Sequence, residues 1–152
     1  MHHRRLLLPI LFTVAACTAH PPRPGPVNYE KATAAKPYDD VLAELELAIT
    51  EQNFRITGHN HIGSVIRSRE NIAFPDYDTL QFCNLTLAKQ MLEMSPAAVA
   101  HMPCNVAVRS ENGQVIVTTH LLPEDSDNEK LNAFFREMNG KLRKIVDFAV
   151  DQ

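Results

Sequence analysis

Apolar residues recur at helical spacing in four segments of the chain. The first segment begins at Pro37 and Asp39 or Asp40 and places five of them on one helical face: Val41, Leu42, Leu45, Ala48 and Ile49. A short helix is expected from Ser64 to Glu70. Another runs from Leu85 to Met94, is entered through Asn84 or Thr86, and stops before Pro96.

The longest helical pattern lies at the C-terminal end. It follows Ser126 and Glu129, which have the spacing of a capping box. We expect this helix to bury eight apolar side chains: Leu131, Phe134, Phe135, Met138, Leu142, Ile145, Val146 and Ala149.

Alternating polar and apolar positions predict the strands. Phe54 to Ile62 alternates, and so does Asp78 to Cys83, with Leu80 and Phe82 directed inward. The segments Cys104–Ser110 and Gln114–Leu121 flank Asn112-Gly113, a strong hairpin signal because both residues adopt positive φ readily. The predicted order is α-β-α-β-α-β-β-α. We expect a single α+β domain in which helices cover one face of a mostly antiparallel sheet of about four strands.

The N-terminal residues resemble an export signal. An apolar run from Leu6 to Ala16 follows Arg4 and Arg5, and it is too short for a bilayer, which takes about 20 residues. Val14-Ala15-Ala16-Cys17 resembles the bacterial lipobox, which implies cleavage after residue 16 and lipidation of Cys17. The resemblance implies a lipid-anchored protein of the bacterial cell envelope. Thr18 in place of an aspartate favours the periplasmic face of the outer membrane.

The rest of the chain divides into a spacer and a domain. Residues 17–36 hold the lipidated cysteine and a proline-rich segment with few large apolar groups, so we expect a tether. Residues 37–152 have the length of one domain. The net charge is −3 and becomes more negative once the leader is removed, because the leader carries two arginines and no acid. That balance argues against a nucleic acid partner.

The central part of the chain resembles the domain-of-unknown-function 302 family. The matching features are Phe54, Cys83-Asn84 followed by Leu87-Ala88, and Pro96. Met102-Pro103-Cys104-Asn105-Val106 completes the match, followed by the hairpin and Pro123. Leu85 stands where the family often has proline. The resemblance implies a compact α+β domain that pairs as a homodimer, and it implies no particular chemistry.

Two cysteines, Cys83 and Cys104, remain once Cys17 is lipidated. In an oxidising compartment an even pair suggests a disulfide, which would close a loop of about twenty residues and add ~3 kcal/mol of stability. Two packed thiols, or a reactive or metal-ligating pair, are the alternatives. His101 and Met102 lie just before Cys104, and this combination of imidazole, thioether and thiolate suits copper or haem iron.

Histidines form a second candidate constellation. His59 and His61 are two residues apart on a predicted strand, so they should project from the same side. Counting alternation along the last strand places His120 on the outer face as well. Three imidazoles on one sheet face could hold zinc, copper or haem. A solvated, histidine-rich face is the alternative, and a bulge would rotate one residue away.

The motifs of the common enzyme classes do not occur. The sequence has no Gly-x-Ser-x-Gly, no glycine-rich phosphate loop and no His-Glu-x-x-His. We therefore expect a non-enzymatic, membrane-tethered binding module for a small ligand, haem or a soft metal such as copper. A thiol redox protein that uses Cys83 and Cys104 is the first alternative. A purely structural envelope lipoprotein is the second.

Overall fold

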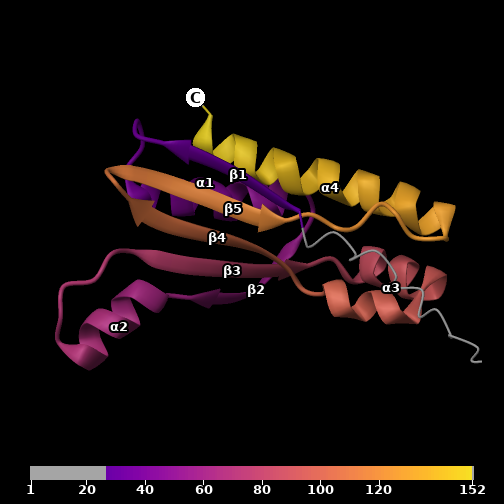
Figure 1. Ribbon diagram of the computed structural model, residues 1–152, viewed down its shortest axis with the longest axis horizontal. Coiled ribbons are helices and arrows are strands. Elements are labelled where there is room, and N and C mark those ends of the chain that lie inside the picture. The colour runs from indigo at the N-terminus through magenta and orange to yellow at the C-terminus, as the bar shows by residue number, and fades with distance from the viewer. Residues whose placement is uncertain (1–26, 152) are drawn as a thin grey trace, which may run out of the picture.

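Five antiparallel strands form a single sheet in the order β1-β5-β4-β3-β2 (Figure 1). The computed structural model describes residues 27–151. Within that range the strands are β1 Asn28–Thr33, β2 Arg55–Asn60, β3 Tyr77–Cys83, β4 Cys104–Glu111 and β5 Gln114–His120.

The two longest helices cover one face of this sheet. They are α1 Tyr38–Glu51 and α4 Glu129–Val150, and they lie side by side in Figure 1. The two shorter helices follow adjacent antiparallel strands and therefore lie at opposite ends of the sheet. These are α2 Ile62–Glu70 after β2 and α3 Leu85–Met94 after β3, with a 3-10 turn, η1 Pro96–His101, after α3. The α+β prediction is confirmed.

The hydrophobic core lies between the sheet and the α1–α4 layer. Leu80 and Phe82 of β3 are fully buried, as their alternation predicted, and so are Val106 of β4 and Val117 of β5. Seven of the eight positions expected for the C-terminal helix are buried, while Phe134 is only partly covered. The opposite face of the sheet carries mostly small and polar side chains.

The strand β1 lies inside the segment predicted to be a spacer. It has no run of large apolar residues, and it is held by pairing with β5 from Asn28–His120 to Thr33–Val115. The Tyr29 hydroxyl also donates to Asp147 of α4 at 2.6 Å. The prediction of a tether is wrong for residues 28–33, and β1 is a fifth strand beside the expected set of about four. Cross-strand hydrogen bonds and contacts with α4 stabilise β1, although its own sequence has no apolar alternation.

The long helix α4 begins differently from the predicted capping box. Asn128 is its N-cap, and its side-chain oxygen accepts from the amide of Leu131 at 3.2 Å. The Ser126 hydroxyl instead donates to the side chain of Asn132 at 2.7 Å. The prediction was wrong because asparagine is as good an N-cap as serine and stands two residues closer to the helix.

The predicted signal segment, tether start and Cys17 lie outside the described residues. Between residues 27 and 151, no helix combines the length and the apolar character that crossing a membrane requires.

Candidate functional site

A β-bulge in β2 decides which way His59 points. The register passes from Ile56–Phe82 to Gly58–Gln81, so Thr57 is extra and alternation shifts by one residue. His59 consequently pairs with the buried Leu80 and faces the helix layer. The prediction that His59 lies on the outer face of the sheet is therefore wrong.

His59, His61 and Asp78 form a compact cluster beneath the first turns of α1. The Nε2 atom of His59 lies 3.0 Å from Oδ1 of Asp78, and Nδ1 of His61 lies 2.7 Å from the same oxygen. The two imidazole rings are themselves close, with centroids 3.9 Å apart. One ligand atom from each of the three residues falls within 4.8 Å of the others.

Asp78 is the buried anchor of this cluster. It is 7 % exposed, and its second oxygen accepts a 2.8 Å hydrogen bond from the Tyr38 hydroxyl, at the start of α1. Burial and this carboxylate raise the pKa of Tyr38 far above its usual range, so the phenol remains a hydrogen-bond donor. The remaining oxygen, Oδ1, is thus directed at the two histidines.

Close packing at Gly63 holds His61 in position. His61 is the N-cap residue of α2, and Gly63 lies in the first turn of that helix. A Cβ at Gly63 would overlap the carbonyl oxygen of Pro75 and lie 2.8 Å from the amide nitrogen of Tyr77. The bare backbone of Gly63 therefore lets α2 rest directly on the segment that leads into β3 and Asp78.

The ligand set suits a divalent transition metal. Imidazole nitrogen and carboxylate oxygen bind such ions at about 2.0–2.2 Å, which puts neighbouring ligand atoms roughly 3.3 Å apart in a tetrahedral site. The histidine–aspartate distances of 3.0 and 2.7 Å are within several tenths of an ångström of that spacing. Glu46, whose Oε1 lies 3.6 Å from Nδ1 of His59, would orient that ring as outer carboxylates do in metal sites.

A second group of predicted residues gathers at the opposite end of β3. Cys83 and Cys104 are both free thiols and line one small cavity of about 20 Å³, together with His101 and Met102. Burial, and secondarily the nearby Cys83, raises the pKa of the Cys104 thiol to about 11. The structure thus brings the predicted cysteine and His-Met-Pro-Cys groups together, without the disulfide that was one of the alternatives.

Comparison with known proteins identifies the family. The model described as "Domain of unknown function DUF302" matches residues 29–149. The chain belongs to the DUF302 family. It is similar to the crystal structure of an uncharacterized conserved DUF302 protein from Bacillus stearothermophilus, with a TM-score of 0.69 and 16% identity over 80% of this chain and 97% of that chain. At this identity the likeness shows the fold alone. The chain has no match among curated proteins.

His120 of this DUF302 chain lies apart from the other two histidines. It is exposed at the end of β5, and its Nδ1 lies 2.6 Å from the Asn28 side-chain oxygen on β1. Two strands, β4 and β3, separate its strand from β2 in the sheet. The predicted set of His59, His61 and His120 on one face is therefore wrong, because the β2 bulge turns His59 inward and His61 leaves the strand to cap α2.

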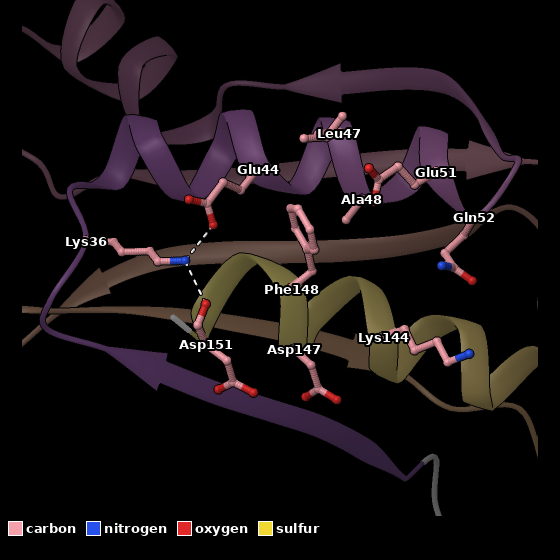
Figure 2. A pocket seen from close by; sticks show the side chains of 10 residues that line it. All are labelled: Lys36, Glu44, Leu47, Ala48, Glu51, Gln52, Lys144, Asp147, Phe148 and Asp151. Atoms are coloured by element: carbon pink, nitrogen blue, oxygen red, sulfur yellow. Dashed lines mark hydrogen bonds and ion pairs between the residues drawn. The ribbon is translucent and has the colours of Figure 1, made fainter.

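A groove of about 890 Å³ lies elsewhere in the DUF302 domain, between α1 and α4 (Figure 2). Its apolar part is formed by Leu47, Ala48 and Phe148. Lys36 at its rim is already satisfied, because its Nζ contacts Glu44 at 2.6 Å and donates to the carbonyl of Asp151 at 2.9 Å. This groove has no convergent set of ligating side chains, so we place the candidate chemistry at His59, His61 and Asp78.

Sequence reasoning missed the third member of the cluster. Asp78 is an acid at an inward position of a strand whose other inward residues are Leu80 and Phe82. A carboxylate in such a position needs partners. That signal was present in the sequence, but it could not say that the partners were Tyr38, His59 and His61.

Proposed function

We propose that this DUF302 chain is a non-enzymatic binding module for a divalent transition-metal ion held by His59, His61 and Asp78. The observation that carries the proposal is the convergence of two imidazole nitrogens on one oxygen of a buried carboxylate, at 3.0 and 2.7 Å. A bound cation would lie between the two imidazole nitrogens and this carboxylate oxygen.

The surroundings of the cluster favour a metal over a packed polar core. The His61 side chain is 57% exposed while that of Asp78 is 9% exposed, so the cluster opens to solvent on one side and is anchored on the other. The open side leaves coordination positions for water or for an exogenous ligand. Mixed nitrogen and oxygen ligands favour zinc or copper(II) over calcium and magnesium, which prefer oxygen alone.

Zinc titration of the purified chain tests this function. We expect one Zn²⁺ to bind per chain, and His61→Ala to weaken binding about 30-fold, which corresponds to about 2 kcal/mol. His120→Ala is the matched control, since it removes an exposed histidine that lies outside the cluster, and it should leave the affinity unchanged. Isothermal titration calorimetry at neutral pH measures all three affinities.

The titration also separates a specific site from adventitious binding. Mg²⁺ and Ca²⁺ should give no response, and acid should weaken Zn²⁺ binding because the imidazoles must be deprotonated to ligate. Equal losses in His61→Ala and His120→Ala, or no binding by the unaltered chain, would contradict the metal assignment.

We further propose that the module is lipid-anchored in the bacterial cell envelope, on the strength of the Val14–Cys17 sequence alone. We expect the mature protein to begin at an acylated Cys17 and to partition into detergent. Cys17→Ser should abolish acylation and leave an uncleaved leader, as measured by mass spectrometry of the intact protein. An unaltered chain that keeps its leader, or that starts at an unmodified residue, would contradict the anchor.

A further inference from the structure

Sulfur-containing residues from five parts of the fold line the small cavity near Cys83. Cys83 ends β3, Cys104 begins β4, Met91 comes from α3, Met138 from α4, and Met102 from the segment between η1 and β4. Three of the four methionines in the described residues therefore line a single cavity. We call these five side chains and the cavity they surround the sulfur pocket.

The size and lining of the sulfur pocket suit an ion better than water or an organic molecule. Its volume of about 20 Å³ has room for a single ion or a single water molecule. Organic ligands occupy sites of roughly 300–1,000 Å³. Most of the remaining lining is apolar: Phe54, Leu87, Ala88, Leu122 and Phe134. A buried water needs two to four hydrogen-bonding partners, and such a lining offers few.

A surface hollow leads to the pocket. Cys83, Ala88 and Met102 line the inner cavity and also a wider depression of about 570 Å³ beside α3. Cys83 and Met102 are both half-buried, so each side chain contacts solvent as well as the interior of the domain. An ion reaching the depression would meet a thiol and a thioether before entering the cavity.

We propose that the sulfur pocket is a binding site for a soft monovalent d¹⁰ cation of the copper(I) class. Thiolate and thioether ligands select such ions, and imidazole–carboxylate sites do not. When Cu⁺ binds, one thiol loses its proton to solvent and a copper–sulfur bond forms, while neutral thioethers complete the coordination. The charges of one thiolate and one monovalent cation cancel, which is the arrangement that an apolar cavity tolerates best.

Binding of Cu⁺ to Cys104 requires that its thiol release a proton. The pKa of Cys104 is about 11, so its thiol is protonated at neutral pH and must give up a proton to ligate. Binding should therefore acidify a weakly buffered solution by one proton per ion, and release of no proton would overturn thiolate ligation.

Anaerobic titration with Cu⁺ against a chromophoric chelator tests the site in the full chain. We expect one ion per sulfur pocket and an ultraviolet thiolate-to-copper band, with Met91→Leu weakening binding about tenfold. Met94→Leu is the matched control, because Met94 lies on the same helix and packs against the core but does not line the cavity. Leucine conserves the volume of methionine in both variants.

Two further measurements keep the outcome decisive. Cys104→Ser should remove the ultraviolet band while retaining Zn²⁺ binding at His59, His61 and Asp78, which reports an intact fold. His61→Ala should leave Cu⁺ binding unchanged, so failure of one site is distinguishable from failure of the other. Equal affinities in Met91→Leu and Met94→Leu, a band that persists in Cys104→Ser, or a Cys83–Cys104 disulfide in the isolated protein would overturn the proposal.

Discussion

Replacing Asn139 by leucine should lower the free energy of unfolding by about 4 kcal/mol. Asn139 is 3% exposed on the core side of α4 and bonds both backbone groups of the buried Leu122. Its Oδ1 accepts from the Leu122 amide at 2.8 Å, and its Nδ2 donates to the Leu122 carbonyl at 2.9 Å. Leucine fills the space but leaves both groups unpaired, at about 1–3 kcal/mol each.

Chemical denaturation measures this loss, and thermal unfolding should show a fall in Tm of roughly 15 °C. Asn60→Leu is the matched control, because Asn60 is exposed and its amide donates only to the Thr79 hydroxyl. We expect that variant to change stability by less than about 0.5 kcal/mol. Similar losses in the two variants would mean that the segment between β5 and α4 is not held by Asn139.

Gly63→Ala should destabilise the chain by about 2–3 kcal/mol and, in addition, reduce Zn²⁺ affinity by up to as much as His61→Ala does. The new methyl group would meet backbone atoms of Pro75 and Tyr77, which cannot rotate away as a side chain would. Overpacking of this kind costs about 1–3 kcal/mol and exceeds the ~1 kcal/mol that alanine normally contributes to a helix. Relief requires α2 to move, and with it His61.

Gly140→Ala is a control that should raise the free energy of unfolding instead of lowering it. Gly140 lies within α4, and a Cβ there would meet no atom of another element within 4 Å. We expect that variant to gain about 1 kcal/mol from helix propensity and to keep its Zn²⁺ affinity. Denaturation curves and zinc titrations of the two alanine variants check both parts. A Gly63→Ala chain that retains full stability would show that α2 tolerates displacement from the 75–77 backbone.

The two proposed metal sites lie at opposite ends of one strand. Asp78 is near the start of β3 and Cys83 is its last residue, about 16 Å apart at the usual rise per residue. One end offers imidazole and carboxylate, the other thiol and thioether. The same strand would thus present ligands for a divalent borderline ion and for a monovalent soft ion, at sites far enough apart to bind independently.

The sequence determined every element whose own side chains repeat at helical or strand spacing. The helices α1, α3 and α4, the inward positions of β3, and the hairpin at Asn112-Gly113 all follow from local patterns, because burying one face of an element requires that periodicity. The same local reasoning singled out Cys83, Cys104, His59 and His61 as chemically interesting.

Tertiary structure alone decided which of those residues meet. β1 has no apolar stripe and exists as a strand because β5 and α4 bind it. A single extra residue at Thr57 turned His59 from the outer face toward Asp78, since one residue of shift reverses every side chain beyond it. Alternation along a strand is a local property, whereas the register between strands and the partners of a buried carboxylate are set by segments distant in the chain.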